Sequence, residues 1–146
     1  KILSEKELKK LFWEFGGETF AAPIAKKIVQ TRAHQPLTTT KQLADLIVKI
    51  KPRLRIHPAT QVFQALRIAV NTELDNLRLA LLETPKFLKP NAPLAVITFH
   101  SGEDQIVKEF LQGSVFTSLT LHYPTDAEIN NNPRSRSARL RAAYLK

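Results

Sequence analysis

Four polar side chains follow directly after one apolar segment of the sequence. Residues 94–99 are apolar except for one threonine, and His100, Ser101, Glu103 and Asp104 come next. Histidine, serine and carboxylates are the residue types of nucleophilic and acid–base catalysis. Neighbours in one tight loop rarely form a triad, because a triad needs partners that the fold brings together. We therefore interpret His100, Ser101 and Asp104 as residues that shape a pocket, and the catalytic residue stays unassigned.

The same residues also have a purely structural interpretation. Ser101 is a candidate N-cap for a helix over residues 103–111, because a serine hydroxyl can accept a free backbone N–H there. Glu103 and Asp104 would then lie in the positive first turn of that helix. Both interpretations place these side chains at the carboxyl end of a strand, which is where ligands bind in open α/β sheets.

The densest cationic stretch contains arginines and serines but no acidic residue: Arg134, Ser135, Arg136, Ser137, Arg139 and Arg141. Arginine gives bidentate hydrogen bonds to phosphate, and serine hydroxyls add neutral ones. The alternative is a solvated final strand with alternating arginines. The lack of acids favours contact with a polyanion.

A second basic stretch lies between residues 49 and 56. If this stretch is extended, four cations share one face: Lys49, Lys51, Arg53 and Arg55. Such a strip could follow the phosphates of a nucleic acid. It could equally be a linker whose cations are merely solvated, and the sequence leaves both interpretations open.

The charge of the chain is segregated. The 146 residues carry a formal charge of +9, of which residues 1–58 contribute +7, residues 59–132 contribute −3 and residues 133–146 contribute +5. Two basic ends around an acidic middle indicate a polyanionic partner, although a solvated basic surface is the alternative.

Several kinds of site are absent from the sequence. The chain has no Cys, which excludes disulfides and thiolate metal sites. The four histidines (His34, His57, His100 and His122) have no metal-ligand spacing, so we expect no metal site. The four glycines form no phosphate-cradling turn, so we expect no dinucleotide or S-adenosylmethionine motif in this chain.

Hydrophobic periodicity and capping residues predict a mainly helical first third and an α/β remainder. The capping box at residues 4–7 opens a helix that ends at Gly16, and further helices are predicted over residues 19–32, after residues 38–40 and over residues 59–82. Strands are predicted at residues 94–99, 115–122 and 138–145, with no helix between the last two because Asn and Pro are frequent there. The first strand is apolar on both faces, which is typical of a parallel sheet covered by helices.

The first residue is Lys1 rather than Met, so we expect a processed chain or a fragment. The polar start does not resemble a signal peptide. No apolar run approaches the ~18 residues of a membrane helix, so no membrane partner is expected.

Three stretches together resemble one family: HPATQVFQALRIAVNTEL (57–74), LAVITFHSGEDQIVK (94–108) and NPRSRSARLR (132–141). They are similar to the RsmH/MraW family of 16S rRNA cytosine-N4 methyltransferases. The region before His57 also resembles that family's helical insertion. The chain departs from the family pattern at Gln61, Gly102 and Gln105, where the family usually has Arg, Leu and Arg.

The resemblance implies an α/β fold: the later half of a Rossmann-like seven-stranded methyltransferase core, preceded by part of an inserted all-α domain. Residues 1–58 would belong to the RNA-facing helical insertion and residues 59–146 to the core. Residues 94–99 would form the fifth strand, and the last two strands would form a closing antiparallel pair. The S-adenosylmethionine site would lie upstream, with no cofactor-binding residue in this chain.

The function implied is methyl transfer from S-adenosylmethionine to N4 of a cytidine in small-subunit rRNA, in cytoplasmic ribosome biogenesis. The fragment alone would be inactive. The expected RNA-binding residues are Lys49, Lys51, Arg53, Arg55, Asn132, Arg134, Ser135, Arg136 and Arg139. The alternatives are a non-catalytic RNA-binding module derived from such an enzyme and, least favoured, a small hydrolase using His100 and Ser101.

Overall fold

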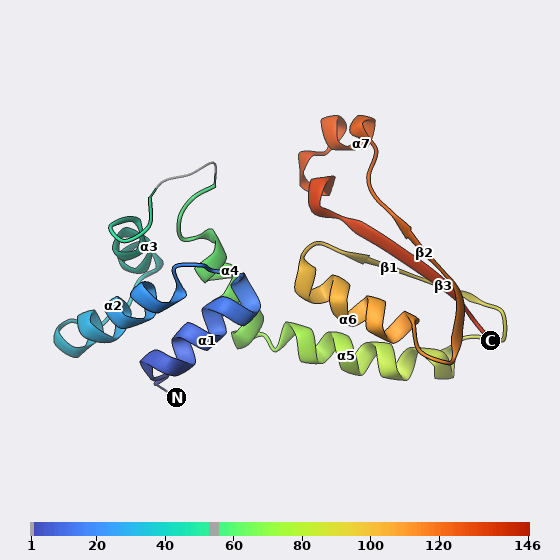
Figure 1. Cartoon of the computed structure of the whole chain (residues 1–146), viewed down its shortest axis with the longest axis horizontal. Helices are drawn as coiled ribbons and strands as arrows, with labels where there is room; N and C mark the ends of the chain where they lie inside the picture. The colour runs from blue at the N-terminus through green and yellow to red at the C-terminus, as the bar shows by residue number, and fades with distance from the viewer. Residues whose placement is uncertain (1, 53–55) are drawn as a thin grey trace. The chain divides into compact units, whose positions relative to one another are not determined.

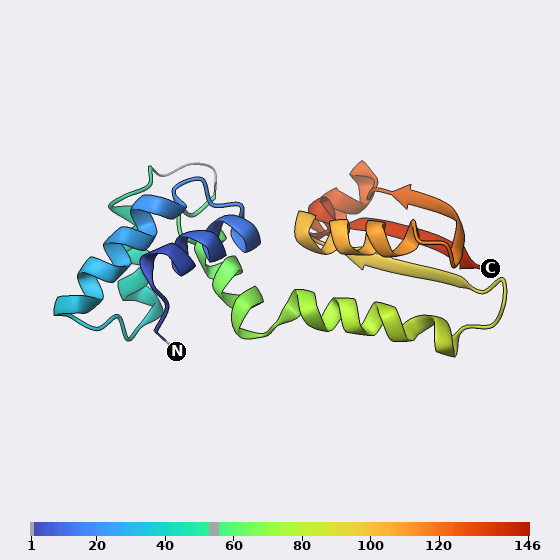
Figure 2. The same cartoon turned by 60° about the horizontal axis from the view of Figure 1, so that its bottom comes forward.

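The computed structural model describes residues 2–52 and 56–146, and it divides the chain into two compact units. The first unit, Lys1–Glu73, is helical, and the second, Leu74–Lys146, combines helices with a sheet (Figures 1 and 2). No helix of the described residues is long and apolar enough to cross a membrane.

The helical unit contains α1 (Glu5–Gly16), α2 (Ala21–His34), α3 (Thr40–Val48) and α4 (Thr60–Val70). The predicted capping box of α1 is confirmed, because Ser4 Oγ accepts from Glu7 N while the Glu7 carboxylate accepts from Ser4 N. Thr39 caps α3 in the same way with Gln42. Gly17 ends α1 in the left-handed region at φ 58°, a conformation that suits glycine.

The apolar faces of these four helices form one core. Phe12 of α1, Ile24 of α2, Ile47 of α3 and Val62 of α4 are each completely buried in it. A Cβ atom at Gly16 would collide with the carbonyl oxygen of Gln61, so glycine is what allows α1 to approach α4 closely. Burying these side chains is the main favourable term in the folding of the unit.

A buried ion pair crosses the helical unit. Lys51 Nζ donates to Glu18 Oε2 at 2.7 Å and to Gln61 Oε1 at 2.7 Å, and the side chains of Glu18 and Lys51 are 0% and 9% exposed. Glu18 Oε1 also accepts from Phe20 N, and Gln61 Nε2 donates to the carbonyl of Gly17. The network joins the turn after α1 to the segment after α3 and to the first turn of α4.

The second unit holds a three-stranded antiparallel sheet in the order β1-β3-β2. The strands are β1 (Pro93–Thr98), β2 (Phe116–His122) and β3 (Arg139–Leu145), close to the three predicted segments. α5 (Glu73–Glu83) and a 3₁₀ turn, η1 (Thr84–Phe87), precede β1, and α6 (Ser101–Leu111) lies between β1 and β2. The predicted antiparallel pairing of the last two strands is confirmed.

Helix α6 packs against all three strands and closes the core of this unit. Ile106, Val107 and Leu111 of α6 are buried together with Leu81 of α5 and Ala143 of β3. The rings of Phe110 and Phe116 meet with centroids 5.2 Å apart and planes tilted by 59°, which is a favourable aromatic geometry. The sheet and α6 therefore pack together as two layers around one core.

The predicted long helix over residues 59–82 is wrong. The chain breaks at Asn71 and Thr72, and Thr72 has φ 51°. The apolar stripe runs through the break, so periodicity alone could not reveal it. The two compact units divide between Glu73 and Leu74, because α4 packs into the helical core while Leu74 and Leu77 pack into the second core.

Two further predictions about the second unit need correction. The described strands are antiparallel rather than parallel, and β1 is covered on one face only, since Ile97 is 58% exposed while Thr98 is buried. The segment expected to lack helix contains α7 (Asp126–Asn131) and a 3₁₀ turn, η2 (Pro133–Ser137). A capping box between Thr125 and Glu128 stabilises α7 against the unfavourable asparagines.

Replacing Lys51 with Met should destabilise the helical unit by about 3–5 kcal/mol, because the buried Glu18 carboxylate would lose the cation that pairs with it. Urea unfolding followed by circular dichroism measures this loss. The double variant Glu18→Gln/Lys51→Met should recover part of the stability. Lys41→Ala, which breaks an exposed pair with Asp45, is the control and should change little. A loss under about 1 kcal/mol for Lys51→Met would contradict the assigned role of the pair.

Candidate nucleic-acid interface

The turn from β1 into α6 is built by a reciprocal cap. His100 is the N-cap residue, and its Nδ1 accepts from Glu103 N at 3.3 Å. The Glu103 carboxylate accepts from Phe99 N at 2.8 Å and from His100 N at 3.3 Å. Because Nδ1 is an acceptor, the ring proton lies on Nε2, which is fully buried and 3.3 Å from Glu103 Oε1.

The cap therefore corrects the predicted role of Ser101. Ser101 is the first residue of α6 rather than its cap, and it is exposed. Its hydroxyl makes no hydrogen bond to His100 within the described residues, and the acceptor nitrogen of His100 is already used by Glu103. A hydrolase built on His100 and Ser101 has no support in this geometry, since a serine nucleophile needs a base within hydrogen-bond reach.

Asp104 is the electrostatic centre of the second unit. Its carboxylate accepts from Arg141 Nε at 2.7 Å, from Arg141 Nη2 at 3.1 Å and from Arg139 Nη1 at 2.6 Å. The side chains of Asp104 and Arg141 are 7% and 9% exposed, whereas that of Arg139 is 42% exposed. The bidentate bond holds Arg141 inside, and the single bond leaves most of the Arg139 guanidinium free.

The arginines shift the titration of this carboxyl group. The hydrogen bonds from Arg141 are the largest cause that lowers the pKa of Asp104 below its ordinary value, and Arg139 lowers it further while burial opposes both. The same contact raises the pKa of Arg141. Asp104 thus remains an anion in the folded protein, and it neutralises only one of its two cationic partners.

The alternation of β3 explains why these arginines face α6. Arg139, Arg141 and Ala143 lie on one face of the strand, and Ala143 is fully buried in the core. A buried guanidinium needs an anion, and Asp104 on the inner side of α6 supplies it. The alternative interpretation, a solvated final strand with alternating arginines, is therefore wrong for Arg141.

Two neighbouring cavities lie beside this cluster. The large cavity, of about 890 Å³, is lined by residues from β1, β2, α7, η2 and β3: Ile97, Phe99, His122, Tyr123, Pro124, Glu128, Asn132, Arg134, Ser135, Ala138 and Leu140. The small cavity, of about 290 Å³, is lined by Phe99, His100, Ser101, Tyr123, Arg136, Ser137, Ala138 and Arg139. Three lining residues are common to both.

The shared wall of the cavities is aromatic. Phe99 is 54% exposed and Tyr123 is 63% exposed, and both line the two cavities. The Arg139 guanidinium carbon lies 6.0 Å from the centroid of the Tyr123 ring, at the edge of cation–π range. Exposed aromatic rings beside free cations are the combination that binds single-stranded nucleic acid, through stacking and phosphate contacts.

Most of the predicted site residues meet at these cavities. His100, Ser101, Arg136 and Arg139 line the small one, and Asn132, Arg134 and Ser135 line the large one. Asp104 lines neither cavity, and its carboxylate accepts a hydrogen bond from Arg139, which lines the small one.

The predicted basic strip is not a continuous cationic face. Lys49 is exposed directly after α3, but Lys51 is buried and paired with Glu18. Arg53 and Arg55 lie outside the described residues. Basic and apolar residues alternate over residues 49–56, and this pattern predicts that Lys51 faces the solvent with the other cations. In the structure, Lys51 is buried instead.

Sequence reasoning missed the aromatic residues Phe99 and Tyr123. Each follows the last residue of a strand, at the end of β1 or β2, where a side chain can leave the core. The available signal in the sequence was an aromatic residue directly before a polar turn, which indicates a ring at the edge of the core. The sheet order, which brings the two strand ends to one region, was not readable from the sequence.

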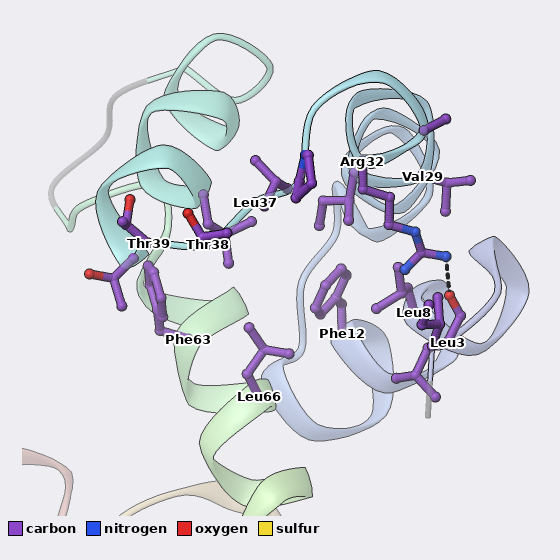
Figure 3. A pocket seen from close by; sticks show the side chains of 16 residues that line it. Leu3, Leu8, Phe12, Val29, Arg32, Leu37, Thr38, Thr39, Phe63 and Leu66 are labelled. Atoms are coloured by element: carbon purple, nitrogen blue, oxygen red, sulfur yellow. Dashed lines mark hydrogen bonds between the residues drawn. The ribbon is translucent and has the colours of Figure 1, made fainter.

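The helical unit has a hollow of its own. It encloses about 910 Å³ between α1, α2, α3 and α4, and its lining is predominantly apolar (Figure 3). Leu8, Phe12 and Leu66 face it, and Arg32 donates a hydrogen bond to the carbonyl of Leu3 at its edge. Arg32, the cation among the described residues that line the hollow, is thus bonded to the backbone. The hollow therefore has few polar groups that could bind a nucleic acid.

The described residues contain no cluster of metal-ligating side chains. No group of three or more His, Asp or Glu side chains among them could hold a metal ion. The turn between β1 and α6 is filled by the His100 ring and the Glu103 carboxylate, and a Cβ at Gly102 would lie 3.3 Å from that ring. This turn therefore has no open backbone cradle for a cofactor.

Comparison with known proteins establishes the class. The MraW methylase family matches residues 1–120, and the chain belongs to that family. The resemblance read from the sequence is thereby confirmed.

Curated relatives are named ribosomal RNA small subunit methyltransferase H. The protein of Picosynechococcus sp. is 49% identical over 97% of this chain and 50% of its own length. Those of Thermomicrobium roseum and Coprothermobacter proteolyticus are 45% and 48% identical, over 96% and 95% of this chain and 50% and 49% of their own lengths. The chain thus spans about half the length of the curated relatives it matches.

Asp104→Asn should make the stability of the second unit less sensitive to acid. A carboxyl group with a lowered folded-state pKa stabilises the native state fully above its ordinary value of 3.8, and this contribution is lost as the pH falls below that value. The variant should be less stable at pH 7, and its difference from the parent should shrink between pH 4 and pH 2. Urea unfolding at each pH measures both. A difference that is independent of pH would contradict the ionic role of Asp104.

Proposed function

We propose that the intact protein containing this chain transfers a methyl group from S-adenosylmethionine to N4 of a cytidine in small-subunit rRNA. The chain supplies the C-terminal portion of such an enzyme, as its coverage of about half of each relative suggests. The proposed methyl transfer is a step of ribosome biogenesis in the cytoplasm.

One observation carries the proposal. In a chain of the MraW methylase family, two adjoining cavities at the end of β1 combine aromatic walls with arginines that have free donors. Such a site suits a nucleotide within a polyanion better than a small neutral molecule. A three-stranded antiparallel sheet packed on α6 is consistent with a fifth strand and a closing pair of a seven-stranded methyltransferase core.

The role of this chain in the reaction is to bind and orient the RNA. S-adenosylmethionine supplies an activated methyl group when it is bound, and we propose that residues upstream of this chain hold it. The exocyclic amine of cytosine is a weak nucleophile, because its lone pair is delocalised into the ring. Accurate positioning of the base can therefore supply much of the rate enhancement. Tyr123 and Phe99 offer the stacking surface for that purpose.

The RNA contacts divide between the two units. Asn132, Arg134, Ser135, Arg136 and Arg139 contact the RNA at the cavities. The second group is Lys49, Arg53 and Arg55 of the helical unit, which we propose as phosphate contacts from their charge. Lys51 is omitted because Glu18 neutralises it.

A chimera tests the function. The chain replaces the matching half of the Picosynechococcus relative, with which it is 49% identical. The chimera should methylate small-subunit rRNA, and mass spectrometry of the digested nucleosides should detect N4-methylcytidine. The unmodified relative serves as the positive control, and a thermal melt confirms that the chimera is folded. A folded chimera that binds the rRNA without modifying it would instead favour the non-catalytic RNA-binding module.

The RNA contacts have a separate test in salt. Arg134→Ala/Arg136→Ala should weaken binding to a single-stranded rRNA oligonucleotide. It should also reduce the slope of log affinity against log salt by about 1.4, since each lost phosphate contact on a single strand accounts for ~0.7. Fluorescence anisotropy at several salt concentrations measures both quantities. An unchanged slope would remove these two arginines from the interface.

A further inference from the structure

The small cavity contains hydrogen-bond donors that nothing in the described part of the chain uses. Arg136, Ser101 and Ser137 make no side-chain hydrogen bond there, and Arg139 spends one of its nitrogens, Nη1, on Asp104. Arg136, Ser101 and Ser137 are exposed, so water occupies their donors in the free chain. A ligand rich in acceptor oxygens can replace that water in the cavity without competing with a bond inside the protein.

The charge around the small cavity is positive. Asp104 neutralises one charge of Arg139 and Arg141 together, and Arg136 adds another. Glu103, which neighbours Asp104 in the sequence, accepts from the backbone N–H groups of Phe99 and His100. The oxygen-rich ligand should accordingly be an anion.

The cavity dimensions and the shared wall narrow the ligand class. About 290 Å³ is room for a phosphate with part of its sugar, whereas about 890 Å³ beyond Phe99 and Tyr123 is room for a base with its neighbours. A free phosphate ion would have no use for an aromatic wall. A phosphodiester whose base stacks on that wall would use both.

We infer that the small cavity is a phosphodiester subsite of the RNA. Arg136 and Arg139 grip one phosphate there, and the base attached to the next sugar stacks on Tyr123 in the large cavity. This inference rests on the proposed function for the identity of the polymer, and it adds the register in which one nucleotide is held. Arg139 is pre-positioned by Asp104, whereas Arg136 is free to close on the phosphate.

The test is a thermodynamic cycle between one arginine and one phosphate. The full 146-residue chain is titrated with a small-subunit rRNA oligonucleotide in which each phosphate in turn is replaced by an uncharged methylphosphonate. Arg136→Ala and one particular methylphosphonate should each weaken binding roughly ten-fold, the usual size of a charge-assisted hydrogen bond. Combined, they should cost no more than either alone.

A second cycle tests the base. Tyr123→Ala should weaken binding roughly ten-fold, and an abasic nucleotide next to the sensitive phosphate should remove that effect. Tyr123→Phe, which keeps the ring, should bind like the parent. The control Lys89→Ala removes an exposed cation that lines neither cavity. Its effect on the affinity for RNA should be the same whichever phosphate carries the methylphosphonate.

The outcomes separate this inference from the proposed function. If Arg136→Ala is additive with every methylphosphonate while the chimera still forms N4-methylcytidine, the subsite is wrong and the function stands. If coupling appears at one phosphate while the chimera is inactive, the subsite stands and the function fails. Inorganic phosphate that competes with the RNA at millimolar concentration, without any coupling to Tyr123, would show a free-anion site and overturn the inference.

Discussion

The carboxylate of Asp104 is the constraint on which the second unit depends. Strand β3 presents Arg139 and Arg141 toward α6, and a buried guanidinium without an anion would cost several kcal/mol. Asp104 on the inner side of α6 removes that penalty and also ties the helix to the central strand of the sheet. Because it bonds Arg141 through two nitrogens and Arg139 through one, it produces one structural arginine and one that remains available.

A buried acid also determines the position of a cation in the helical unit, but there the cation is buried instead of remaining available. Lys51 is buried in an ion pair with Glu18. The charge pattern predicts Lys51 as an RNA-binding cation, but in the structure it joins two turns of the helical unit. The count of 22 lysines and arginines is therefore larger than the number of cations that the surface can offer to a partner. In both units, the balance between a buried acid and its basic neighbours decides which cations face outward.

Much of the fold follows from local signals. Ser4 starts its helix as its capping box predicts, the N-cap expected at residues 38–40 is Thr39, and the three strands lie where the apolar segments predict them. The two errors about helices arose where one local signal outweighed another. The apolar stripe over residues 59–82 is continuous although Thr72 breaks the helix, and the capping box at Thr125 outweighs the weak helix propensity of the residues after it.

The sequence by itself determined the family, the position of most helices and strands, and several of the polar residues that line the cavities. Those properties depend on residue type and short-range spacing, which a linear pattern records. Only the tertiary structure decided that Phe99 and Tyr123 share a wall, that Asp104 lies behind the site rather than in it, and that Lys51 is buried while Arg136 is free. Each of these depends on sheet order and on ion pairs between residues more than 20 positions apart, because a buried charge is stable only where the fold brings its partner.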